Sequence, residues 1–90
     1  MYTIDYLGQA TADLQKLRRS EPKAYKKVAK LIEELKVHPK TGTGHPEPLR
    51  GNRSNQWSRR ITDKHRLVYE IRDTEVIVIV IAAYGHYEDK

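Results

Sequence analysis

A run of eight apolar residues near the C-terminus constrains the fold more than any other feature. Residues 76–83 read Val-Ile-Val-Ile-Val-Ile-Ala-Ala. Six of the eight are β-branched, which favours an extended strand. Successive side chains of a strand point to opposite faces of its sheet, so this strand needs cover on both faces. The run therefore predicts an inner strand of a sheet.

Two shorter segments before this run alternate between apolar and polar residues, as half-buried strands do. In the first, Trp57, Arg59 and Ile61 share one face and Ser58 and Arg60 the other. In the second segment, one face carries Leu67, Tyr69 and Ile71, and the other face carries Arg66, Val68 and Glu70. Short polar turns at 62–65 and 72–75 connect the segments, so a meander of antiparallel strands is expected. Residues 2–6 alternate as well and predict a short strand with Tyr2, Ile4 and Tyr6 on one face.

Two amphipathic helices are predicted in the first half of the chain. The helix expected at about residues 8–19 repeats Ala10, Leu14 and Leu17 at helical spacing. Ser20-Glu21-Pro22 predicts a second helix start, with Ser20 as its cap, and Pro39 ends that helix. The second helix has one apolar stripe, formed by Ala24, Val28, Leu31, Ile32 and Leu35.

The expected architecture is an α+β fold with the helical hairpin packed on one face of a mainly antiparallel, four- to five-stranded twisted sheet. Residues 39–51 hold three of the four prolines and three of the five glycines. This turn-rich segment is too short to separate domains, so residues 1–90 are expected to form one domain.

The composition excludes several classes of protein. The chain has no cysteine, which excludes disulfide bonds, a thiolate nucleophile and Cys-ligated zinc. No segment approaches the roughly 20 apolar residues of a membrane-spanning helix. Residues 1–5 lack the basic start and apolar run of a secretory signal. A soluble, cytoplasmic protein with no membrane partner is therefore expected.

The positive charge is concentrated in the middle of the chain. The net charge is +5, and residues 39–70 contribute 7 basic and 3 acidic side chains, five of the basic ones being arginine. Arginine suits bidentate contact with phosphate oxygens, so this segment is the candidate for binding a polyanion. The alternative is an ordinary solvated surface.

Glu47 is a candidate general base because Pro46 and Pro48 hold its backbone extended. An ordinary glutamate on a rigid surface loop is the alternative.

His86 and Tyr87 follow the apolar run closely. Histidine suits a proton donor near neutral pH, and tyrosine can hydrogen-bond or stack on a base, although both could equally belong to a loose terminal tail.

Arg59, Arg60 and Arg66 lie on strands that are expected to be neighbours. Guanidinium groups that converge on one face can bind a phosphate and stabilise the extra negative charge of a pentavalent transition state. Structural ion pairs with Glu70 or Asp63 would explain the same residues.

No metal site and no cofactor are expected, because the four histidines form no HxH or HExxH pattern and there is no Gly-rich phosphate loop. Glu, Arg, His and Tyr are sufficient for metal-free RNA cleavage. In that reaction a base deprotonates a 2′-OH, the oxygen attacks the adjacent phosphorus, and an acid protonates the 5′-leaving oxygen.

Four motifs together resemble the YoeB/Txe family of bacterial toxins. They are Pro46-Glu47-Pro48-Leu49, Trp57-Ser58-Arg59-Arg60-Ile61-Thr62, His65-Arg66-Leu67-Val68-Tyr69 and Gly85-His86-Tyr87. The resemblance implies a RelE-like fold and a ribosome-dependent endoribonuclease that cleaves mRNA in the decoding site. It also implies a YefM/Phd-type antitoxin with an acidic tail, with the ribosome and mRNA as further partners, and it leaves a homodimer open.

The resemblance also implies roles for individual residues. The catalytic set would be Glu47 as base, Arg66 on the phosphate, His86 as general acid and Tyr87 as the terminal active-site tyrosine. The RNA-binding set would be Arg50, Arg59, Arg60 and His65. Gly85 before the final His-Tyr and the extension 88–90 depart from the family pattern.

Two other hypotheses remain open at this point. One is a non-catalytic basic module that binds RNA or the ribosome, for which Glu47 and His86 would be expendable. The other is a fold relative that poisons a different target, such as a topoisomerase.

Overall fold

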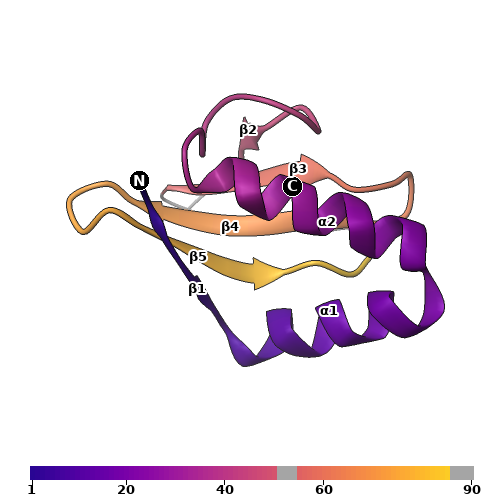
Figure 1. Cartoon of the computed structure of the whole chain (residues 1–90). Helices are drawn as coiled ribbons and strands as arrows, with labels where there is room; N and C mark the ends of the chain where they lie inside the picture. The colour runs from indigo at the N-terminus through magenta and orange to yellow at the C-terminus, as the bar shows by residue number, and fades with distance from the viewer. Residues whose placement is uncertain (51–54, 86–90) are drawn as a thin grey trace.

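A five-stranded mixed sheet carries both helices on one face (Figure 1). The computed structural model describes residues 1–50 and 55–85, and His86 and Tyr87 lie outside these residues. The elements along the chain are β1 (Thr3–Tyr6), α1 (Gly8–Ser20), α2 (Pro22–Leu35), β2 (Glu47–Pro48), β3 (Gln56–Arg60), β4 (Arg66–Arg72) and β5 (Ile77–Ala82). The predicted α+β architecture is confirmed.

The strand order is β1-β5-β4-β3-β2. β3 to β5 form the expected antiparallel meander; the short β2 adds antiparallel to β3, and β1 is parallel to β5. β5 therefore lies between two strands, as its apolar sequence predicts. The two helices provide the crossover from β1 to the rest of the sheet, which a parallel pair of strands requires.

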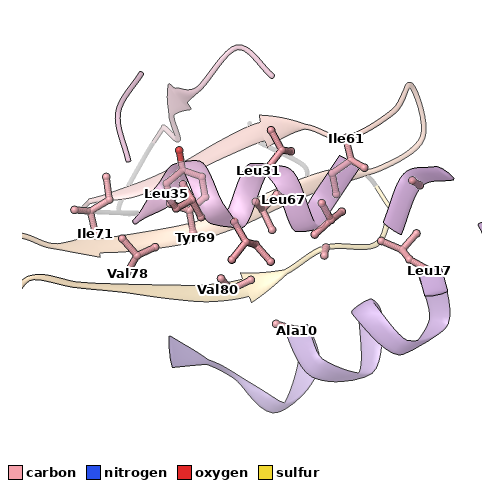
Figure 2. Close-up of a cluster of buried hydrophobic side chains, with 14 residues drawn as sticks. Ala10, Leu17, Leu31, Leu35, Ile61, Leu67, Tyr69, Ile71, Val78 and Val80 are labelled. Atoms are coloured by element: carbon pink, nitrogen blue, oxygen red, sulfur yellow. The ribbon is translucent and has the colours of Figure 1, made fainter. Parts of the chain in front are cut away.

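The core lies between α2 and the sheet (Figure 2). The predicted stripe of α2 is buried along its whole length, and Pro22 occupies the first turn of the helix, where a missing N–H costs little. The sheet face below the helices contributes its own set of buried side chains, namely Leu67, Tyr69, Ile71, Val78 and Val80. Burial of this apolar area is the main stabilisation of the fold.

One local prediction is wrong. Ser20 does not cap α2: it is the last residue of α1, and its hydroxyl donates to the Lys16 carbonyl at 2.7 Å. Glu21 occupies the cap position without a side-chain cap bond. Tyr2 and Ile4 pack against the core, and Tyr6 is 46% exposed. Tyr6 is the last residue of β1 and pairs with Val80 of β5, just before the chain turns into α1.

The strand register separates the arginines of β3. Arg59 lies opposite Leu67, on the face covered by the helices. Arg60 lies opposite Arg66, on the other face.

Within the described residues, no helix is long and apolar enough to cross a membrane.

Candidate active site

Glu47 and Arg66 meet on the sheet face away from the helices. Glu47 on β2 pairs with Ser58 of β3, and β3 pairs in turn with β4, which begins at Arg66. Glu47 Oε1 lies 3.8 Å from Arg66 Nη1. The carboxylate is 63% exposed and the guanidinium 25% exposed, so both groups can reach a ligand from solvent. The structure thus brings together two residues that are nineteen positions apart in sequence.

Backbone hydrogen bonds on both sides of β2 hold Glu47 in place. The Arg60 amide donates to the Gly44 carbonyl at 2.7 Å, and the Leu49 amide donates to the Gln56 carbonyl at 2.9 Å. The short β2 strand is therefore attached to β3 before and after the carboxylate. With proline on either side, the backbone of Glu47 has little freedom to move the carboxylate away from Arg66.

Arg60 also lies on this face and is exposed, and Arg50 is exposed just beyond β2. Arg60 thus shares a sheet face with Arg66, and Arg50 follows Glu47 by three residues in the chain. His86 and Tyr87, the other two members of the predicted catalytic set, lie outside the described residues.

Arg59 is buried and not accessible to RNA in this structure, which contradicts its expected role in RNA binding. Its side chain is completely buried, and Nη1 lies 2.9 Å from Glu34 Oε1. The guanidinium also donates to Tyr69 Oη and to three backbone carbonyls, those of His38, Thr41 and Thr43. Arg59 therefore anchors the segment that leads to β2 onto the core.

Glu34 completes this buried network. Its carboxylate accepts hydrogen bonds from the Thr43 amide at 2.9 Å and the Thr43 hydroxyl at 2.7 Å. These two bonds, followed by the Arg59 guanidinium, hold the pKa of Glu34 below its ordinary value. Burial raises the pKa of the Tyr69 hydroxyl, and the bond from Arg59 opposes that rise.

His65 is the second predicted RNA contact that the structure places in the interior. It is 3% exposed, with Nε2 2.7 Å from Glu21 Oε2. Its Nδ1 accepts a hydrogen bond from the Gly85 amide at 2.8 Å. Both ring nitrogens of His65 are bonded within the protein, so neither is free to bind a phosphate.

Three supporting carboxylates were not predicted: Asp13, Glu21 and Glu34. Asp13 is 6% exposed and accepts a hydrogen bond from the Ala83 amide at 2.9 Å. Its sequence signal was a charge within the apolar stripe of α1, three residues after Ala10 and four before Leu17. Glu21 and Glu34 gave no comparable signal, because their partners are distant in sequence.

The arrangement can accept a proton at Glu47 and hold an anion at Arg66. An exposed carboxylate beside a guanidinium is the geometry that a general base and a phosphate-binding group need. Across residues 1–50 and 55–85, no group of three or more His, Asp or Glu side chains is placed to hold a metal ion.

The chain matches known toxins over almost its whole length. Residues 6–87 match the family model of the YoeB-like toxin of bacterial type II toxin–antitoxin systems. Toxin YoeB of Streptomyces coelicolor is 42% identical over 84 residues, covering 93% of this chain and 98% of the relative.

Solved structures agree with this match. A YoeB/ParE toxin from Agrobacterium tumefaciens superposes with a TM-score of 0.88 at 33% identity, covering 97% of this chain and 100% of that one. The toxin in a YoeB–YefM complex from Staphylococcus aureus gives a TM-score of 0.81 at 30% identity, with coverages of 97% and 99%. Sequence and fold together place this chain in the YoeB-like family of bacterial type II toxins.

Proposed function

We propose that this toxin is an endoribonuclease that cleaves mRNA in the ribosomal A site and so stops translation. The observation that carries the proposal is the approach of Glu47 to Arg66 on an open sheet face. A carboxylate and a guanidinium in this arrangement match the base and the phosphate-binding group of 2′-OH attack. Membership of the YoeB-like toxin family supports the assignment of this chemistry to a toxin.

In the proposed reaction, Glu47 removes the proton from a ribose 2′-OH, and that oxygen attacks the neighbouring phosphorus. Arg66 holds the phosphate and stabilises the charge that develops on its oxygens. His86 gives a proton to the departing 5′-oxygen, and Tyr87 positions the substrate next to it. The products are a 2′,3′-cyclic phosphate and a 5′-hydroxyl, so proton transfers alone balance the step.

Arg50 and Arg60 are proposed to guide the RNA backbone to the site. Both are exposed and lie near β2 or on the same face as Arg66. Arg59 and His65 are left out of the RNA-binding set, because each is buried and its polar atoms bind within the protein.

The proposed partners follow from the relatives. The S. aureus toxin was solved in complex with YefM and also as a dimer. We propose a YefM/Phd-type antitoxin for this chain, with an acidic tail that covers the arginines around Glu47, and homodimerisation as a second assembly. A toxin that acts on translating ribosomes works in the cytoplasm.

The test is induction of the toxin without its antitoxin, with messages mapped by primer extension. Wild type should produce new 5′-ends within translated codons. Glu47→Gln should lower cleavage by about 100- to 10,000-fold, the range usual for loss of a general base. Arg66→Ala and His86→Gln should also reduce cleavage strongly.

Matched controls lie at the far end of β4. Glu75 Oε1 is 3.7 Å from Arg72 Nη1, and the two side chains are 56% and 48% exposed. This pair has a similar separation to the one at the site but lies at the opposite end of β4 from Arg66. Glu75→Gln and Arg72→Ala should therefore cleave like wild type. Binding to ribosomes without new 5′-ends would instead support a non-catalytic RNA-binding module, and DNA-damage signalling without cut messages would support a different target.

A further inference from the structure

Gly85 is held from both sides by two consecutive residues, His65 and Arg66. The Gly85 amide donates to His65 Nδ1 at 2.8 Å, and the Gly85 carbonyl accepts from the Arg66 amide at 3.0 Å. Gly85 has φ +81°, in the left-handed region that favours glycine. The next residue in the sequence is His86, the proposed general acid.

The bonding partners define the tautomer of His65. A backbone amide can only donate, so Nδ1 must be the unprotonated, accepting nitrogen. Nε2 then carries the proton and donates it to Glu21 Oε2, 2.7 Å away. Glu21 thus selects the one tautomer that can hold Gly85, as carboxylates do for histidines in other sites.

The two residues before Gly85 are also fixed. The Ala83 amide donates to the buried carboxylate of Asp13 at 2.9 Å. The Tyr84 ring packs on the His65 ring with centroids 4.4 Å apart, and Lys16 Nζ lies 4.1 Å from the Tyr84 centroid. Residues 83–85 are therefore tied to α1 and to His65 and Arg66 at the start of β4, and His65 is itself bonded to Glu21 before α2.

We infer that His65, oriented by Glu21, is a positioning residue that fixes the segment before His86 relative to Arg66. The inference rests on the proposed function, in which these two residues act on the same phosphate. His65 precedes Arg66 in the chain and binds the residue that precedes His86. Through these links one buried imidazole fixes Gly85, the residue before the proposed acid, relative to the backbone of Arg66.

Two substitutions separate the two bonds of the ring. In His65→Asn the amide oxygen can occupy the place of Nδ1 and still accept from Gly85, while the contact with Glu21 is lost. In His65→Gln the amide can occupy the place of Nε2 and keep Glu21, while the acceptor for Gly85 is lost. Both variants remove the same ring packing on Tyr84.

The measurement is single-turnover message cleavage on saturating ribosomes, with ribosome affinity and thermal stability recorded for each variant. His65→Gln should cleave about 10- to 100-fold more slowly, because a small displacement of a catalytic group has effects of this size. His65→Asn should keep most of the wild-type cleavage rate, although both variants should lose a similar amount of stability. Ribosome affinity should stay at the wild-type level, and His38→Gln, which changes an exposed histidine, should change nothing.

Equal rates in His65→Asn and His65→Gln, or a slower His65→Asn, would overturn the positioning role. Suppose that wild type cleaves messages, that His86→Gln does not cleave them, and that His65→Gln cleaves them at the wild-type rate. The positioning role then fails, and the proposed function stands. If wild type itself makes no new 5′-ends, the proposed function fails and the inference falls with it.

A readout on the wild-type protein covers the case in which both variants fail to fold. The ¹⁵N chemical shifts of the His65 ring should show a protonated Nε2 and an unprotonated Nδ1 at neutral pH. The Gly85 amide should exchange slowly with solvent, in contrast to the exposed amides of the neighbouring turns. A proton on Nδ1 would contradict the bond to Gly85 and overturn the inference.

Discussion

Arg59 and Arg60 are adjacent in sequence and have opposite roles. Alternation along β3 turns Arg59 into the core and leaves Arg60 exposed on the face of Arg66. The buried guanidinium is tolerated because its donors meet the Glu34 carboxylate, the Tyr69 hydroxyl and backbone carbonyls. No buried side-chain nitrogen or oxygen in the described part of the chain lacks a partner. The charge of Arg59 is therefore part of the core, whereas the charge of Arg60 is exposed to solvent on the other side of the strand.

The same substitution at these two positions should therefore have very different costs. Arg59→Met should lower the free energy of unfolding by about 3–5 kcal/mol, because it removes one partner of a buried ion pair and leaves carbonyls unbonded. Arg60→Met should change it by less than about 0.5 kcal/mol, as is usual at exposed sites. Urea unfolding of both variants measures the difference, and equal values would refute the structural role of Arg59.

Arg59→Lys tests whether charge alone is sufficient at this position. Lysine keeps the positive charge but cannot reproduce the planar set of donors of a guanidinium. We expect an intermediate loss of stability, closer to that of Arg59→Met than to wild type. A lysine variant as stable as wild type would show that the several hydrogen bonds of Arg59 contribute little.

At the scale of elements, periodicity predicted most of the fold. The stripe of α2 and the apolar run of β5 are local patterns, and both were confirmed because each needs only its own sequence to identify a buried face. The start of α2 was less predictable. Ser20 and Glu21 both suit a cap by composition, and the choice between them depends on the turn geometry between the helices.

The candidate site was predictable only in part. The motifs singled out Glu47 and Arg66, which the sheet register brings together. Alternation had already placed Arg59 with Trp57 and Ile61, on the apolar face, but a lone arginine there gives no hint of its partners. The bonds of Arg59 and His65 are made with residues 10 to 44 positions away, so no local pattern could reveal them.

Gly44 lies in the segment between α2 and β2, three residues before Glu47. Gly44 has φ +87°, and a Cβ built there would lie 2.9 Å from the Arg60 carbonyl oxygen, which is backbone and cannot move aside cheaply. Gly44→Ala should therefore cost about 1–3 kcal/mol and also slow cleavage, because Gly44 accepts the bond that holds the segment before Glu47.

Gly8→Ala is the matched control. A Cβ at Gly8, the first residue of α1, would meet nothing within 4 Å. Alanine there should be neutral or stabilise by up to about 1 kcal/mol, since it restricts the unfolded chain. Thermal unfolding and cleavage assays on the two variants provide the comparison. A Gly44→Ala protein with normal stability and normal cleavage would show that this turn does not position Glu47.

At the scale of the whole molecule, the net charge of +5 predicts RNA affinity that falls with salt. Each phosphate contact on a single strand contributes about 0.7 to the slope of log affinity against log salt. Arg60→Ala should lower the magnitude of that slope by about 0.7, and Arg72→Ala at the far end of β4 should leave it unchanged. Titration of a short RNA at several salt concentrations measures both slopes, and an unchanged slope for Arg60→Ala would remove this residue from the RNA path.

The Arg59 network also sets how the stability of the molecule depends on pH. The pKa of Glu34 is lowered from 4.5 by its bonds to Thr43 and Arg59, so its ionised form stabilises the fold. This stabilisation is present above about pH 4.5 and is lost as the pH falls through the depressed pKa of the folded state. The pKa of Tyr69 is raised above 10.0 by burial. Its contribution is complete below about pH 10 and is lost as the pH rises through the raised value.

Urea unfolding across the pH range should therefore give a plateau of stability with a loss at each end. Glu34→Gln should make the acid loss shallower without removing it, because the pKa of Asp73 is also lowered, chiefly by its bond from Tyr2. Tyr69→Phe should make the alkaline loss shallower and leave the acid side as it is. Each variant thus alters one end of the profile, and the other variant serves as its control. An acid loss of wild-type steepness in Glu34→Gln would mean that the carboxylate bound to Thr43 and Arg59 does not stabilise the fold through its charge.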